Sequence, residues 1–448
     1  MGSIGLNSVS SADAGGGIDV QGIVDQIIYS ERAPERLMQT QQTQLNSEAA
    51  ALRDISSKLT DLQTKVDSLN DLSGNFNAKV VTSSASDILT ASASEVAQSG
   101  SHTVLVNSLA TVSSAYTDQL ASSSDTFSTG SFDLQVGSGT PTTITVDTTN
   151  NTLDGLAAYI NELDIGVTAS VISDAQGSRL ALVSNASGQS GDLTLTNNTT
   201  GLVFNKGASG TNASLTVDGV PVSSDSNTVT GVIPGVTLSL AGAAPGTSVL
   251  LTVKPDTSSA SSAINDFVTS YNAVVQAINA QFTFNSATGS AGVLSGSTSL
   301  RMVQQQVLSD IAYSTTGNGG FVNLSTIGVQ MADDGTLSVD SSALDDALQN
   351  HFAEVQNLFQ STSPSGFARS FSADLDQLTD SVNGPLNVEL NGITQNVKDI
   401  ADGIADFEDR IAQRQVQLID EYSRIDALVR QIPLMLQQIN SQLGSLQS

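Results

Sequence analysis

The chain has 448 residues, of which 39% are hydrophobic, and this suffices for about three domains with buried cores. Sixteen Lys and Arg residues against 44 Asp and Glu residues give a formal net charge of -28, so nucleic acid and anionic membrane surfaces should repel the chain. The absence of cysteine excludes disulfides, thiolate metal sites and cysteine nucleophiles.

The first segment, residues 1–40, is predicted to hold a flexible tail and a first leg helix. Residues 1–17 are small and polar, without a basic segment followed by an apolar one, so no cleaved secretory signal is expected. No apolar run approaches the roughly 20 residues of a membrane span. We therefore expect a soluble cytoplasmic protein, or one exported by a route that needs no cleaved signal.

Helical spacing begins with Ile18, Ile23, Ile27 and Ile28. Pro34 is expected either to open the next helix in its first turn or to kink one continuous helix. Residues 41–78 then form a stem helix, whose apolar residues recur every three or four positions: Leu45, Leu52, Leu59, Leu62, Val66 and Leu69.

The middle of the chain changes to strand periodicity. Apolar residues alternate with polar ones from about Lys79 to Pro255, which predicts half-buried antiparallel strands. We expect one head domain in two parts, residues 79–119 and 209–255. A second β domain with one helix, residues 120–208, is expected to be nested between these parts.

Helical periodicity returns in residues 256–424, predicted to be a helical stem domain. It contains a hairpin around Asp333-Asp334-Gly335, followed by a helix capped by Ser341 or Ser342. The fold class is therefore α+β multidomain, with a helical coiled-coil stem built from both chain ends and inserted antiparallel β head domains.

The C-terminal stripe is long enough to reach beyond a globular body. Its stem part is predicted to pack through Ile404, Phe407, Ile411 and Leu418, and residues 425–448 form a C-terminal leg helix. Pro433 lies inside this repeat, so a kink or a break is expected there. After a break, the piece from Leu434 to Leu446 would be about 13 residues, too short to form a stable helix before it docks.

No arrangement of residues indicates catalysis. The histidines are far apart, His102 in a strand region and His351 on a helix, and both are interpreted as ordinary surface or packing residues. Neither a nucleophile elbow nor a phosphate loop occurs. Paired carboxylates could act in the head, as in glycosidases, but the chain has no Trp to stack on a glycan. We expect no enzyme, no metal and no cofactor.

Several stretches, in this order, resemble the flagellar hook-associated protein 2 family of bacterial filament-capping proteins. They are Gly17-Ile18-Asp19-Val20 with Glu31-Arg32-Ala33-Pro34, Thr82-Ser83-Ser84, Asp174-Ala175-Gln176-Gly177-Ser178, Leu215-Thr216-Val217-Asp218-Gly219, Val253-Lys254-Pro255-Asp256, Leu324-Ser325-Thr326-Ile327-Gly328 and Asp334-Gly335-Thr336-Leu337.

The resemblance implies a ring-like homo-oligomer at the flagellum tip, beneath which exported flagellin folds and inserts. It implies further partners, the hook-filament junction proteins and an export chaperone on the C-terminal helix, and export by the flagellar type III system. Leg contacts with the filament or with other subunits would be made by Ile18, Ile23, Ile27, Ile28, Leu428, Ile432, Leu436, Ile439 and Leu443. The alternative is an adhesin whose β head binds host mucin or matrix.

Overall fold

The computed structural model describes residues 17–286, 289–362 and 365–445. The fold is mixed α+β, as predicted. Contacts divide the chain into two compact units. The stem unit comprises Met1–Asn70, Ala263–Ala347 and Ala353–Ser448, and the head unit comprises Asp71–Ser262 and Leu348–Phe352. The stem therefore contains both ends of the sequence, and most of the head is inserted between its segments.

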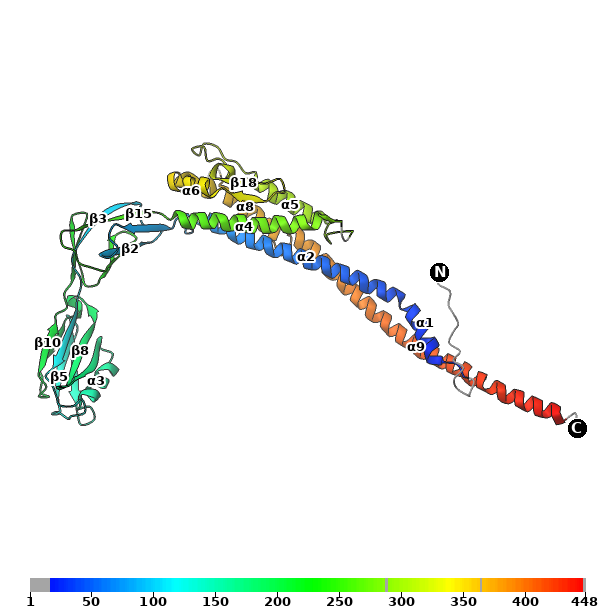
Figure 1. Cartoon of the computed structure of the whole chain (residues 1–448), viewed down its shortest axis with the longest axis horizontal. Coiled ribbons are helices and arrows are strands. Elements are labelled where there is room, and N and C mark those ends of the chain that lie inside the picture. Colours follow the sequence, from blue (N-terminus) through cyan, green and yellow to red (C-terminus); the bar gives the residue numbers. More distant parts are fainter. Residues whose placement is uncertain (1–16, 287–288, 363–364, 446–448) are drawn as a thin grey trace. The chain divides into compact units, whose positions relative to one another are not determined.

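Long helices at the two ends of the chain form the stem unit (Figure 1). The helices outside the β region are α1 (Val20–Glu31), α2 (Ala33–Asn70), α4 (Thr257–Phe282), α5 (Thr298–Ile311), α6 (Ser341–Asn350), α7 (Phe352–Gln360), α8 (Phe367–Thr379) and α9 (Pro385–Ser445). Asp19 caps α1 by accepting a hydrogen bond from the Gly22 N–H. Pro34 lies in the first turn of α2, where its missing N–H has no helical partner to lose.

Helices α1 and α2 run antiparallel to the later helices. The Ile18 N–H bonds Asp426, Glu31 pairs with Arg414, and the Gln63 side chain accepts from Thr379. Contacts thus advance along one strand of the stem as they recede along the other. The predicted apolar stripe of α2 is buried except for Leu45, which is half-buried.

An aromatic cluster closes the other end of the stem. Phe367 of α8 lies with its ring 5.5 Å from that of Phe267 on α4, 5.7 Å from that of Phe359 on α7 and 5.6 Å from that of Phe371. All of these rings are fully buried, so this cluster fixes how α4, α7 and α8 meet.

The hairpin predicted around Asp333-Asp334-Gly335 is present between β18 (Val329–Met331) and β19 (Leu337–Val339). A second short hairpin joins β16 (Phe284–Asn285) and β17 (Ser290–Ala291), and a 3-10 turn, η2, spans Leu324–Ile327. The helix after the hairpin is capped by neither serine: the Asp340 carboxylate accepts from the N–H groups of Ser342 and Ala343. A carboxylate is the stronger acceptor at a helix N-terminus, so it takes this position from the hydroxyls. His351 lies between α6 and α7 instead of on a helix.

The outer part of the head unit packs two antiparallel sheets on one core. Five strands lie in the order β1-β15-β3-β11-β12 and three in the order β13-β14-β2. Residues from both sheets, among them Val106, Leu238 and Leu251, form the shared core. The strands are β1 (Lys79–Ser83), β2 (Leu89–Ala93), β3 (Gly100–Ser108), β11 (Ala213–Val217), β12 (Val220–Ser224), β13 (Thr228–Ile233), β14 (Val236–Leu240) and β15 (Ser248–Pro255).

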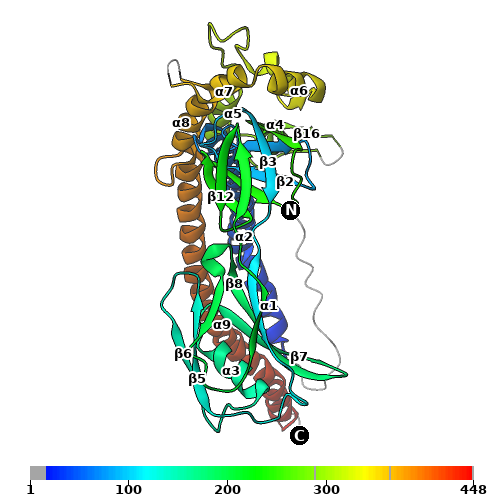
Figure 2. The ribbon, with the colours of Figure 1, turned by 90° about the vertical axis from the view of Figure 1, so that its left-hand side faces the viewer.

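The nested part has its own core between a four-stranded sheet, β10-β4-β8-β7, a three-stranded sheet, β6-β5-β9, and helix α3 (Figure 2). Its elements are β4 (Val112–Thr117), β5 (Gly130–Val136), β6 (Thr142–Val146), α3 (Leu153–Glu162), β7 (Val167–Asp174), β8 (Gly177–Ser187), η1 (Gln189–Gly191), β9 (Leu193–Thr196) and β10 (Phe204–Ala208). Strand β4 pairs with β8 and β10, so the nested sheet includes residues before the predicted start at 120.

Candidate assembly surface on the C-terminal helix

Helix α9 is one continuous helix of 61 residues, which corresponds to a length of about 90 Å. Its first half is covered by other stem helices: Leu386 and Ile393 are buried, and α2, α5 and α8 all contact α9. Figure 1 shows its C-terminal end continuing beyond α1. The candidate surface lies where this cover ends.

Helix α1 provides the last apolar cover on α9. Val24 and Ile28 of α1 form a buried cluster with Ile411 and Leu418 of α9, and half-buried side chains including Phe407 and Tyr422 pack around it. Val24 and Ile28 are four positions apart, so both lie on the face of α1 that meets α9. This cluster fastens the N-terminal helix to the C-terminal one by packing.

Polar contacts accompany this cluster. The Arg414 Nε lies 3.6 Å from a Glu31 carboxylate oxygen. Further along, the Asp426 carboxylate accepts from the Ile18 N–H at 2.7 Å and from the Arg430 Nε at 2.7 Å. The Ile18 bond and then the Arg430 bond lower the pKa of Asp426. Asp426 therefore ties the start of the described chain to α9.

Beyond Asp426 the apolar stripe continues without cover from any described residue. Ile425 is 39% exposed, Leu428 62%, Ile432 53%, Leu436 54% and Ile439 50%. At 100° per residue these positions continue the face that α1 covers at Ile411 and Leu418. A run of exposed apolar side chains along one helix face is typical of a surface that binds another protein.

Pro433 lies within this uncovered stretch, and the helix continues through it. Of the two expectations for this position, a break is not seen. Proline has no N–H, so the Val429 carbonyl lacks its usual helical donor, and the ring crowds the preceding turn. The outer end of α9 is consequently a less stable helix than its length suggests.

Comparisons with known proteins identify the family. The model for the flagellar hook-associated protein 2 N-terminus matches residues 16–113, and the model for the C-terminus matches residues 210–433. The chain belongs to the flagellar hook-associated protein 2 family. The nested β domain, for the most part, lies between the two matched segments.

Relatives within this family align along nearly the whole chain. The B-type flagellar hook-associated protein 2 of Pseudomonas aeruginosa is 29% identical, covering 96% of this chain and 97% of that protein. Flagellar hook-associated protein 2 of Escherichia coli strain K12 is 26% identical over 95% of this chain and 96% of that protein. The crystal structure of the D1-D2-D3 domains of the flagellar cap protein FliD from Escherichia coli is similar with a TM-score of 0.61 at 25% identity, covering 77% of this chain and 99% of that one.

The residues predicted as leg contacts fall into two groups in this family member. Ile23, Ile27 and Ile28 lie on α1 and are partly or fully buried against the Phe407 to Tyr422 part of α9. The predicted residues Leu428, Ile432, Leu436 and Ile439 lie on the uncovered part, so the structure does not bring the two groups together. Ile18 begins beside Asp426, and the Leu443 side chain lies outside the described part of the chain.

Sequence analysis did not single out Val24, Asp426 or Arg430. Val24 has a detectable signal, because it lies four positions before Ile28 on one helix face. Asp426 has none, since its partner is a backbone N–H 408 positions earlier in the chain. The predicted stem residues of α9 all lie on the covered face: Ile411 and Leu418 are buried, and Ile404 and Phe407 are half-buried.

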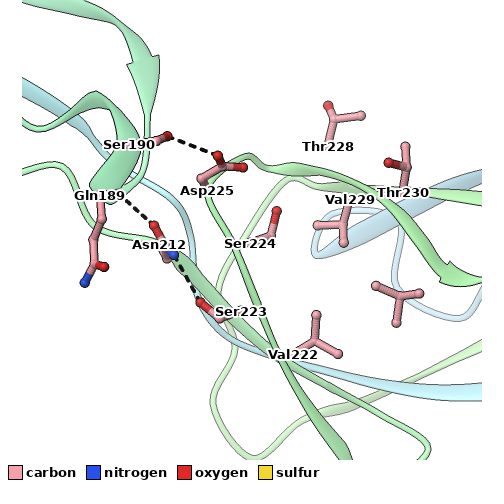
Figure 3. Close-up of a pocket in the computed structure, with 11 residues that line it drawn as sticks. Gln189, Ser190, Asn212, Val222, Ser223, Ser224, Asp225, Thr228, Val229 and Thr230 are labelled. Carbon is pink, nitrogen blue, oxygen red and sulfur yellow. Dashed lines mark hydrogen bonds between the residues drawn. The ribbon is translucent and has the colours of Figure 1, made fainter. Parts of the chain in front are cut away.

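The head unit contains a hollow at the junction of its two β parts (Figure 3). Its polar groups already bond one another: Ser190 donates to the Asp225 carboxylate at 3.0 Å, and Asn212 accepts from the Gln189 N–H at 2.7 Å and donates to Ser223 at 3.2 Å. We interpret this hollow as a structural junction that holds the nested domain on the outer one.

The ionisable groups of the head serve its folding. His102 Nδ1 lies 2.7 Å from an Asp218 carboxylate oxygen, and this contact, followed by the Thr103 N–H bond, lowers the pKa of Asp218 in the turn between β11 and β12. Within the described ranges, no group of three or more His, Asp and Glu side chains is placed to hold a metal ion. Among the described helices, none has the length and apolar character needed to cross a membrane.

Proposed function

We propose that this chain is the subunit of a structural cap at the distal end of the bacterial flagellar filament, where it promotes folding and insertion of exported flagellin subunits. Membership of the hook-associated protein 2 family supports the place. The similarity to the Escherichia coli cap protein supports the shape of the subunit. In this proposal the chain acts by binding and makes or breaks no covalent bond.

The observation that carries the proposal is the uncovered apolar stripe from Ile425 to Ile439 on α9. An apolar side chain contributes roughly 1.5 to 3 kcal/mol when it is fully buried, so several such residues in one row favour association. We propose that this leg surface binds filament subunits, with the same residues as predicted: Leu428, Ile432, Leu436, Ile439 and Leu443. Pro433 weakens the helix there, so the leg is expected to gain helical order when it binds.

The remaining partners follow from the family. We propose a ring-like homo-oligomer, contact with flagellin and with the hook-filament junction proteins, and an export chaperone that covers the leg surface before export. Export is proposed to use the flagellar type III system without a cleaved signal. A chaperone would solve a physical problem, because an exposed apolar stripe promotes aggregation in the cytoplasm.

The test is complementation of a strain that lacks the gene. A variant with Leu428, Ile432, Leu436 and Ile439 all changed to Ser should be exported but should fail to retain flagellin, which is then found as monomer in the medium while motility is lost. The matched control is Leu434→Ser, because Leu434 is 65% exposed but lies about 160° to 200° around the helix from Ile432. Normal filaments and motility with the fourfold variant would refute the proposed leg surface.

The adhesin alternative has less support, because the names of the relatives refer to the flagellum. Saturable binding of the purified chain to mucin or matrix, abolished by changes confined to the head, would be needed to retain it.

A further inference from the structure

Two carboxylates face each other where α5 meets α8 in the stem unit. Asp310 lies near the end of α5, and Asp374 lies in the middle of α8. The Gln306 side-chain amide donates to the Asp310 Oδ1 at 3.0 Å and to the Asp374 Oδ2 at 3.3 Å. One amide group therefore bridges two groups that repel each other when both are ionised.

The bridge leaves part of the charge without compensation. The Asp310 Oδ2 is buried and has no hydrogen-bond partner among the described residues. A buried carboxylate oxygen without a donor is unfavourable, whereas a protonated oxygen could donate to the neighbouring carboxylate. Burial, and after it the charge of Asp374, raises the pKa of Asp310 to about 7.

The surroundings offer this pair little positive charge. Asp376 and Asp380 line the same hollow as Gln306 and Asp374. On α4 the Tyr271 hydroxyl donates to the Gly335 carbonyl at 3.1 Å, and burial followed by the Asp310 charge raises its pKa.

The groups that shift the Asp310 pKa are Asp374 and Gln306, in addition to burial; no basic side chain of the described structure is among them. Arg369, also on α8, keeps a buried Nε that has no partner among the described residues.

We propose that Asp310 and Asp374 share one proton at the contact of α5 with α8, and that loss of this proton loosens the contact between the two helices. The protonated Asp310 oxygen would donate to Asp374, so the pair would carry one negative charge instead of two. The stem unit would then contain a proton-dependent joint that responds near neutral pH, independently of what the leg surface binds.

The pH window follows from the direction of the shift. Below about pH 4 the Asp310 carboxyl is protonated in the folded and the unfolded chain, so it adds no pH dependence. Between about pH 4 and 7 the folded chain keeps a proton that the unfolded chain releases, so stability falls as pH rises. Above about pH 7 the pair is doubly charged and the loss is complete.

The experiment measures unfolding of the stem unit in the full chain from pH 5 to 8.5, followed by hydrogen exchange of α5 and α8 amides after correction for intrinsic rates. In the native chain the opening equilibrium should grow roughly tenfold or more across this range, since one unit of pKa shift corresponds to tenfold. Asp310→Asn should remove most of this growth, because its amide donates to Asp374 at every pH.

Asp409→Asn is the matched control. It removes the same formal charge from an exposed site on α9, and its pH dependence should equal that of the native chain. Equal pH dependence of Asp310→Asn and the native chain would overturn the proposal. It would also be overturned if millimolar Mg²⁺ or Ca²⁺ at pH 8 restored protection as well as acid does, because a cation would then neutralise the pair.

Discussion

The covered and the uncovered stretch of α9 carry the same apolar repeat but have different surroundings. Ile411 and Leu418 are 5% and 3% exposed beneath α1, whereas Ile432 and Leu436 on the same face are 53% and 54% exposed. The cover ends where the described chain begins, at Ile18 beside Asp426. A helical repeat therefore identifies a face that can pack, but the chain itself supplies a partner only as far as α1 reaches.

The largest effect expected from this comparison is that of Leu418→Ala. Removing a buried leucine side chain costs about 2 to 5 kcal/mol, because apolar burial is lost and a cavity remains. The same change at Leu436 removes a side chain that is half in solvent, so about 0.5 kcal/mol or less is expected. Denaturant unfolding of the stem unit, followed through helix content, measures both.

These two variants also test the assignment of the stretches. Similar losses of stability in Leu418→Ala and Leu436→Ala would mean that the outer stretch is covered within the free chain, for example by a second copy. Repeating the measurement over a wide range of protein concentration separates these cases, since association depends on concentration.

The next effect concerns Pro433 and is confined to the uncovered stretch. Pro433→Ala restores the donor for the Val429 carbonyl and removes a clash, which is worth up to about 3 kcal/mol in a helix interior. We expect slower hydrogen exchange from residue 434 onwards and little change in global unfolding. Unchanged exchange there would show that the proline does not limit the order of this segment.

A functional cost would accompany that gain in helix stability. If the leg gains order on binding, a helix that is already stable should bind filament subunits more tightly and reach the export channel less readily. Secreted amounts of Pro433→Ala and native chain, compared in one strain, test this.

The sequence predicted the faces of the helices well and the pairing between them poorly. The stripe of α2 and the hairpin at Gly335 follow from spacing and turn chemistry, which are local. Which part of α9 meets α1 depends on where the antiparallel register begins, and no local pattern encodes it. The Asp310 to Asp374 contact joins residues 64 positions apart on separate helices, so it required the tertiary structure. Asp340 took the cap position from Ser341 through competition between neighbouring acceptors.

A smaller effect is expected from the ion pair at the edge of the covered stretch. Glu31 and Arg414 are separated by 3.6 Å and are 36% and 47% exposed at their side chains. Solvent-exposed pairs contribute about 0.2 to 1 kcal/mol, less at high salt. Glu31→Gln should therefore lower stability by less than Leu418→Ala, and 1 M NaCl should abolish the difference from the native chain. A loss comparable to that of Leu418→Ala would mean that charge, and not packing, fastens α1.

The smallest effect is expected at Asp426, where the cover ends. Its pKa is lowered by the Ile18 N–H bond and then by Arg430, so the ionised form is favoured in the folded chain. Its contribution is therefore present above the unfolded pKa of about 3.9 and is lost as pH falls through the lower folded value. Asp426→Asn keeps an acceptor but removes the charge, so at pH 7 the first turn of α1 should exchange its amide protons somewhat faster while Leu418 stays buried. The difference between variant and native chain should vanish below about pH 3, where the native carboxyl is also neutral. Faster exchange along all of α1 at pH 7 would instead place the main attachment of this helix at Asp426 and not at the Val24 and Leu418 cluster, and the boundary between covered and uncovered α9 would then depend on one hydrogen-bonded carboxylate.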